Sequence, residues 1–188
     1  MIILLIALGL LILLALFVIV TRNSMIESRN RVDEAWSGID VQLKRRHDLI
    51  PNLVETVKGY ATHEREVFVK TTEARAAAMQ TVGRDANVQS VSSAEAALSG
   101  ALADLRAVAE NYPDLRATEN FQQLQRDLNE IEDEIQASRR IYNSNVQSYN
   151  TKIQIFPNSV IAGMSDFEAR EFFEIADPAE REPAEVKF

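Results

Sequence analysis

The two histidines of the chain are the residues around which a catalytic or metal site would be expected. His63-Glu64 begins like a zinc-protease motif, but that motif needs a second histidine four residues later, and position 67 is Val. A di-iron bundle needs a glutamate three residues before each histidine, where this chain has Lys44 and Tyr60. The 188 residues include no cysteine, which rules out disulfides and thiolate chemistry. Phosphate-binding, dinucleotide-binding and serine-hydrolase motifs are also missing from the sequence, so we expect a non-enzymatic protein without metal or cofactor.

One basic cluster, Lys44-Arg45-Arg46-His47, stands out in a chain whose net charge is −8. It predicts either a solvated helix face or a surface that binds an acidic partner. Anionic lipid is a poor partner for it, because residue 44 lies about 36 Å along a straight helix from Val20, beyond the screening length of about 8 Å. The acidic residues between 166 and 185 could supply such a partner, in this chain or in a neighbour. The negative net charge argues against nucleic acid as a partner.

The first twenty residues, Met1 to Val20, are apolar and carry no charge. As a helix they extend about 30 Å, which is the thickness of the hydrocarbon core of a bilayer. We therefore expect a membrane anchor over residues 1–21 that contacts the lipid bilayer through residues 1–20. A cleaved signal peptide would need a basic start, a shorter apolar run and a small-x-small cleavage site, which this stretch lacks. A buried core helix would show a polar face over five turns, and none is present.

Basic residues near the ends of the anchor predict its orientation. Arg22, Arg29 and Arg31 follow the apolar stretch, and no basic residue precedes it. Lysine and arginine near a membrane span are retained on the cytoplasmic side. We therefore expect a single-pass protein with its N-terminus outside and its body in the cytoplasm.

Residues 22–176 are predicted to form an all-α body, because Gly and Pro are scarce and apolar residues recur at steps of three and four. We expect an N-terminal transmembrane helix followed by an elongated antiparallel bundle of about four long helices. An acidic flexible tail over residues 177–188 is predicted to follow. The apolar positions are Val32, Trp36, Ile39, Leu43, Ile50 and Val57; Leu98, Leu102, Leu105 and Val108; and Phe121, Leu124, Leu128, Ile131, Ile135, Tyr142, Val146, Tyr149 and Ile153.

Helix boundaries are predicted from capping residues and prolines. Pro51 interrupts the first stripe, which indicates either a helix that restarts from Asp48 as N-cap or a kinked helix. The sequence Ser92-Ser93-Ala94-Glu95 has the form of a capping box and predicts a helix start. Thr118 and Pro157 are the expected cap and stop of a last helix of roughly 37 residues.

The aromatic residues are predicted to pack in the interior. Trp36 lies on an apolar stripe, so core packing is its expected role. Tyr142 and Tyr149 alternate with asparagines, and this cluster predicts a hydrogen-bonded seam, while a ligand pocket there has no support from the sequence.

The residues from Arg29 to Glu64, and those from Glu110 to Asn150 followed by Phe156-Pro157, resemble the signature of the LemA family. The resemblance covers nearly the whole chain, anchor included. It implies a bacterial, all-helical protein of the inner membrane, with the N-terminus outside, the bulk in the cytoplasm and no established enzymatic activity. Its most specific pieces are Glu34-Ala35-Trp36, KRRHDLIPNL over residues 44–53, Tyr112-Pro113, Tyr142-Asn143 and Tyr149-Asn150.

The motif positions are carried over only as candidates for structural or interaction roles. We expect a non-enzymatic interaction scaffold whose partner is another membrane or cytoplasmic protein. The alternatives are a self-assembling, membrane-organising or membrane-remodelling homo-oligomer, since tethering raises effective concentration, and a ligand-binding sensor or regulator. The candidate interaction residues are Trp36, Lys44, Arg45, Arg46, His47, Tyr112, Tyr142, Asn143, Tyr149 and Asn150.

Overall fold

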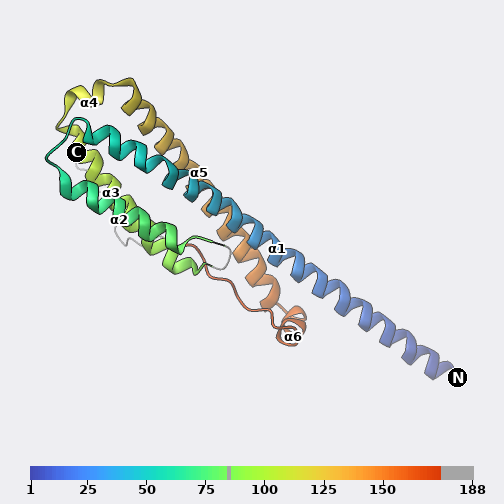
Figure 1. The fold of residues 1–188 in the computed structure, drawn as a ribbon. Coiled ribbons are helices and arrows are strands. Elements are labelled where there is room, and N and C mark those ends of the chain that lie inside the picture. Colours follow the sequence, from blue (N-terminus) through green and yellow to red (C-terminus); the bar gives the residue numbers. More distant parts are fainter. Residues whose placement is uncertain (84–85, 175–188) are drawn as a thin grey trace, which may run out of the picture. The chain divides into compact units, whose positions relative to one another are not determined.

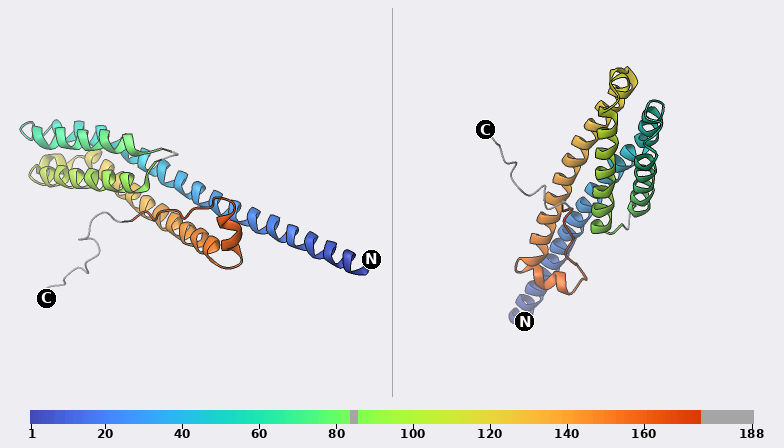
Figure 2. Two further views of the ribbon diagram at one scale, coloured as in Figure 1. Left: turned by 90° about the horizontal axis from the view of Figure 1, so that it is seen from below. Right: turned by 90° about the vertical axis from the view of Figure 1, so that its left-hand side faces the viewer.

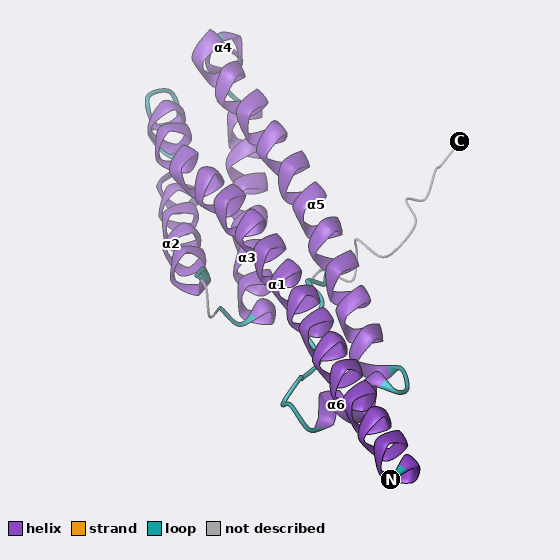
Figure 3. Cartoon of the chain, turned by 90° about the vertical axis from the view of Figure 1, so that its right-hand side faces the viewer, coloured by secondary structure: helices purple, strands orange, loops and turns teal. Residues whose placement is uncertain are grey.

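The computed structural model describes residues 1–83 and 86–174, and the regular structure in these ranges is entirely helical (Figures 1 and 3). This confirms the predicted all-α class with four long helices. The predicted acidic tail, residues 177–188, lies outside the described residues. The helices in chain order are α1 (Ile2–Lys58), α2 (Arg65–Thr81), α3 (Val88–Glu110), α4 (Pro113–Ala117), α5 (Glu119–Gln154) and α6 (Asn158–Gly163).

The chain divides into two compact units, and both α1 and α5 contribute to each of them. The first, here called the anchor unit, comprises residues 1–36 and 140–172. The second, called the bundle unit, comprises residues 37–139 together with 173–174 of the described C-terminal part. In the bundle unit the segments from α1, α2, α3 and α5 alternate in direction along the chain (Figure 1).

The core of the bundle unit is built from the apolar stripes of its helices. Ile50 and Val57 of α1, Leu98 and Leu105 of α3 and Leu128 of α5 are buried in one cluster. Each contributes about 1.5–3 kcal/mol when its side chain leaves water. The stripes read from the sequence are therefore the faces that pack.

Pro51 does not interrupt α1, which runs as one helix from Ile2 to Lys58. The predicted restart with Asp48 as N-cap is therefore wrong. Proline has no N–H, so it leaves the carbonyl of the residue four positions earlier, His47, without a helical donor. Arg75 of α2 supplies the missing donor, since its Nε lies 2.7 Å from the His47 carbonyl oxygen.

The start of α3 also differs from the prediction. The helix begins at Val88, and the side chain of its N-cap Asn87 accepts a hydrogen bond from the Ser90 N–H at 2.8 Å. The capping box at residues 92–95 is therefore wrong, because these residues lie inside the helix and both Ser92 and Glu95 are buried. Residue types that favour helix ends therefore lie inside this helix, where their side chains make other bonds.

The last long helix is close to its predicted length. It spans 36 residues from Glu119 to Gln154, and the hydroxyl of Thr118 accepts from the Phe121 N–H at 3.4 Å, so Thr118 caps it as expected. It ends three residues before Pro157.

In the anchor unit the first part of α1 is exposed over its whole surface, without other described residues packed against it. Its most apolar 18-residue window has a mean hydropathy of 3.5 and none of it is buried. It is the one described helix long and apolar enough to cross a membrane. A core helix of similar composition would be mostly buried, so a core role for this stretch is not supported.

Candidate functional site

A buried ionic cluster joins α1 to α3 in the bundle unit. Arg46 donates from Nη2 to the Glu95 carboxylate, and the other carboxylate oxygen lies 2.8 Å from His47 Nε2. All three side chains are at least nine-tenths buried. Since an ionised carboxylate only accepts, Nε2 is the protonated nitrogen of His47 in this contact. The cluster ties the two helices together at a point where an unpaired charge would be costly.

The same arginine extends the cluster to α5. Arg46 Nη1 donates to Glu132 at 2.9 Å and to the Ser99 hydroxyl at 3.3 Å. Glu132 is half-exposed and borders a groove of about 260 Å³, whose polar lining also includes Ser99, Arg106 and Asn129. Arg46 therefore contacts two carboxylates from two helices, one inside the bundle and one at its surface.

The pKa of Glu95 reflects this surrounding. Burial raises the pKa of the Glu95 carboxyl, but the hydrogen bond from His47 and the positive charge of Arg46 outweigh it. The net result is a pKa below the ordinary value, so Glu95 is held as a carboxylate. Glu95 bonds to both His47 and Arg46 inside the bundle, an arrangement that holds α1 against α3.

The basic run is therefore not one surface. Lys44 and Arg45 are exposed, whereas Arg46 and His47 are buried at 4% and 3% exposure. The expectation of a continuous solvated or partner-binding face over all four residues is wrong for Arg46 and His47. They face Glu95, a buried acid that the helix packing places against α1. Only Lys44 and Arg45 remain available to a partner.

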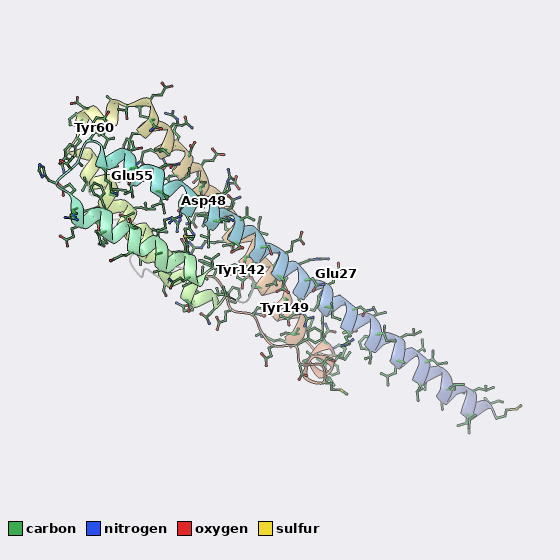
Figure 4. All side chains as sticks on the ribbon, in the orientation of Figure 1. Glu27, Asp48, Glu55, Tyr60, Tyr142 and Tyr149 are labelled. Carbon is green, nitrogen blue, oxygen red and sulfur yellow. The ribbon has the colours of Figure 1, made fainter. Side chains whose placement is uncertain are left out.

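In the anchor unit, two tyrosines of α5 hold the extended segment that follows α6. Tyr142 donates to the Glu171 carbonyl and Tyr149 donates to the Glu168 carbonyl, each at 2.9 Å. Figure 4 labels both tyrosines on α5. Asn150 completes the arrangement, because its amide bonds both the N–H and the carbonyl of Arg170 at 2.9 Å. The predicted hydrogen-bonded seam exists, and its partner is the segment 168–171.

Trp36 packs where the stripe predicted. Its ring centroid lies 5.4 Å from that of Tyr142 at an interplanar angle of 60°, and it is 9% exposed. Burial raises the pKa of both Tyr142 and Tyr149, so each phenol stays protonated and able to donate. The segment also contacts α1, because the side chain of Arg170 pairs with Asp33 at 3.0 Å.

The remaining candidates lie apart from these clusters. Tyr112 is half-buried in the bundle unit and precedes Pro113, the first residue of α4. Asn143 is half-buried on α5 beside Tyr142 in sequence. Met1 and Val20, the ends of the predicted anchor, are both exposed.

Sequence reasoning missed Glu95, and it missed the donors Arg75 and Lys152. A signal for Glu95 was present, because it falls on the apolar face of α3 between Val91 and Leu98. A charge on such a face is a strong hint of a buried partner. Arg75 and Lys152 carry no comparable signal, because their acceptors lie on α1, 28 residues away from Arg75 and more than 120 residues away from Lys152.

Among the described residues no group of three or more His, Asp or Glu side chains is placed to hold a metal ion. The LemA family model matches residues 35–188. The chain belongs to the LemA family. It is 28% identical to Protein LemA of Metamycoplasma hominis over 149 residues, which is 77% of this chain and 65% of that protein.

This LemA-family chain is also similar to magnetosome proteins. It is 23% identical to Magnetosome protein MamQ 2 of Paramagnetospirillum magneticum over 174 residues, or 81% of this chain and 64% of the relative. Magnetosome protein MamQ of Magnetospirillum gryphiswaldense is 23% identical over 159 residues, or 73% and 58%. The chain thus spans a little under two thirds of the length of these relatives. None of these names is that of an enzyme.

Proposed function

We propose that this protein is a single-pass membrane protein that acts as a non-enzymatic interaction scaffold. Residues 1–20 anchor it in the inner membrane of a bacterium, with the N-terminus outside and the helical units in the cytoplasm. The exposed apolar window of α1 supports the anchor, and Arg22, Arg29 and Arg31 support the orientation. A reporter fused after Phe188 tests the orientation, which is refuted if the reporter is active only in the periplasm.

The observation that carries the scaffold role is the division of the basic run. Lys44 and Arg45 are exposed on α1, while Arg46 and His47 fix the same turn of helix to α3 through Glu95. A groove beside Arg45 adds two acidic side chains, Asp127 and Glu130, from α5. A rigid helix that presents long basic side chains next to acids of fixed position suits specific recognition of a protein surface with complementary charge.

The test is a charge reversal restricted to the exposed pair. The full-length protein with Lys44→Glu and Arg45→Glu is compared, by pull-down from membranes, with a double reversal of the exposed Arg65 and Arg126, which changes the net charge equally. We expect the first variant alone to lose a protein that copurifies with the wild type, with both variants melting like the wild type. Retention of every copurifying protein by the first variant refutes the scaffold surface.

In-membrane crosslinking followed by mass spectrometry separates the alternatives. Crosslinks from position 45 to a foreign protein support the scaffold, whereas crosslinks to another copy of this protein favour self-assembly into a membrane-organising array.

A ligand-binding sensor is supported by one observation, the groove lined by Arg46, Arg106 and Asn129. It predicts a small molecule whose binding is lost in Arg106→Met.

A further inference from the structure

The corner between α5 and α6 in the anchor unit exposes apolar side chains in an unusual concentration. Phe156 and Met164 are 83% and 82% exposed, and Ile155 and Val160 are half-exposed. The stretch from 153 to 165 contains no Asp, Glu, Lys or Arg, although the chain carries 48 such residues in its 188. Exposed apolar groups gathered in a charge-free segment mark a surface that is covered when the protein is in place.

Hydrogen bonds between α5 and α1 fix the height of this corner along α1. Asn145 donates to the Arg31 carbonyl at 3.1 Å. Seven residues later on α5, Lys152 donates to the carbonyl of Ser24, seven residues earlier on α1, at 3.2 Å. The two helices therefore run antiparallel, residue for residue, through this stretch.

Extending the register places the corner beside the end of the apolar stretch of α1. Lys152 also donates to the hydroxyls of Ser24 and Ser28, so its ammonium is held close to α1. At this register Gln154, the last residue of α5, lies at the level of Arg22, about 3 Å along the helix from Val20, and Phe156 follows two residues later in the turn to α6. In the views of Figure 2, α6 lies beside α1 just where the projecting N-terminal stretch begins.

We propose that this corner is a second membrane contact, in which Phe156 and its apolar neighbours insert into the interfacial zone of the bilayer that residues 1–20 span. The inference rests on the proposed anchor. Lipid is the occupant because the same unit carries the spanning segment and the register places both apolar surfaces at one level. Aromatic and aliphatic side chains at that depth enter the headgroup region, while Lys152 stays at the polar side of the interface.

The corner would restrict the tilt of α1 in the membrane. A single helix is otherwise free to lean and rotate, since length alone does not fix its tilt. Lys152 bonds the corner to α1. The spanning stretch of α1 and the corner at residues 155–164 then contact the membrane at two separate places, which hold the anchor unit in one orientation. Proteins bound at this unit would then meet the membrane at a constant height.

The absence of cysteine allows a direct test in the full-length chain, since one introduced cysteine gives one label. An environment-sensitive fluorophore is attached at Phe156→Cys and at Met164→Cys in protein reconstituted into phosphatidylethanolamine–phosphatidylglycerol vesicles. Ile141→Cys is the matched control, because this α5 residue in the same unit is 59% exposed and lies far from the corner. Leu10→Cys reports the anchor itself.

We expect nitroxide-labelled lipids to quench the labels at 156 and 164 and to leave the label at 141 bright, while soluble iodide quenches only the label at 141. Quenching at 156 alone still supports the contact and narrows it to the α5–α6 turn. If nitroxide-labelled lipids quench neither the label at 156 nor the label at 164, and iodide quenches both, the proposal is overturned. If the lipids still quench the label at position 10, the anchor is supported and only the second membrane contact is refuted. If they do not quench that label either, the anchor itself is refuted. A corner shielded from both quenchers overturns the lipid contact in favour of a protein neighbour.

Discussion

The Arg75 guanidinium of α2 donates from Nε to the carbonyl oxygen of His47, 28 positions earlier in the chain, at 2.7 Å. That carbonyl is the acceptor that Pro51 leaves without its helical N–H. A side chain from a neighbouring helix thus repairs the hydrogen bonding of α1, which passes through its one internal proline as a single helix. The bond also fixes α2 against the turn of α1 that carries the buried cluster.

Replacing Arg75 should therefore destabilise the protein in a way that depends on Pro51. Arg75→Met leaves a carbonyl without a donor and should lower the free energy of unfolding by about 1–3 kcal/mol. In a Pro51→Ala background the cost should shrink, because the substituted alanine has a backbone N–H that can bond the same carbonyl. Urea unfolding of the detergent-solubilised protein, followed by circular dichroism, measures the wild type, the two single variants and the double variant.

The control for this cycle is Arg65→Met, which removes an exposed arginine at the start of the same helix. It should be nearly neutral in both backgrounds. Equal costs of Arg75→Met with and without Pro51 would show that the arginine does not substitute for the proline's missing donor.

The buried ion pair predicts a sharp difference between adjacent arginines. Arg46→Met leaves the Glu95 carboxylate without its cation and should cost about 3–5 kcal/mol of unfolding free energy. Arg45→Met, one residue earlier but exposed, should change it by less than about 0.5 kcal/mol. Thermal melts of the two variants, run side by side, measure the contrast. Similar melting of both would mean that the pair contributes little to folding.

Acid should weaken the same cluster. The pKa of Glu95 is lower in the folded protein than its ordinary value near 4.5, so its contribution is complete above that value and disappears as pH falls toward the folded-state pKa. Glu95→Gln removes this contribution at every pH. The stability gap between wild type and Glu95→Gln should therefore be largest near neutral pH and narrow below about pH 4.5, as measured by urea unfolding across that range. A gap that widened in acid would contradict the lowered pKa.

Alkali should act on the tyrosines of the anchor unit. Burial raises the pKa of Tyr142 and Tyr149 above the ordinary 10, so folding keeps these phenols protonated. Their stabilising contribution is present below pH 10 and is lost as pH rises through the folded-state pKa. Near-ultraviolet titration should show a late tyrosinate phase.

The assignment of that phase is checked by substitution. Tyr142→Phe and Tyr149→Phe should each diminish the late phase and remove one bond to the segment 168–171. Each lost bond should cost about 1 kcal/mol. An unaltered titration curve in both variants would show that these tyrosines are not the late-titrating groups.

The sequence by itself determined the elements that depend on local chemistry and periodicity. The charge-free stretch from Met1 to Val20 marked the candidate membrane span, and the period of the apolar stripe marked α5 almost to its ends. Thr118 was recognisable as a cap because its bond is to a residue three positions away. Burial of Trp36 followed from its place on the apolar stripe of α1. The seam of Tyr142 and Tyr149 on α5 followed from their alternation with asparagines.

Only the tertiary structure decided which polar groups are partners across the fold. Arg46 and His47 lie between Leu43 and Ile50 on the apolar stripe of α1, but their partner is known only once α3 brings Glu95, about fifty residues away, against them. Pro51 looked like a break because the donor that repairs α1 comes from α2. Capping and periodicity are properties of a few consecutive residues, whereas the bonds of a buried charge depend on the packing of whole helices, which no short stretch of sequence specifies.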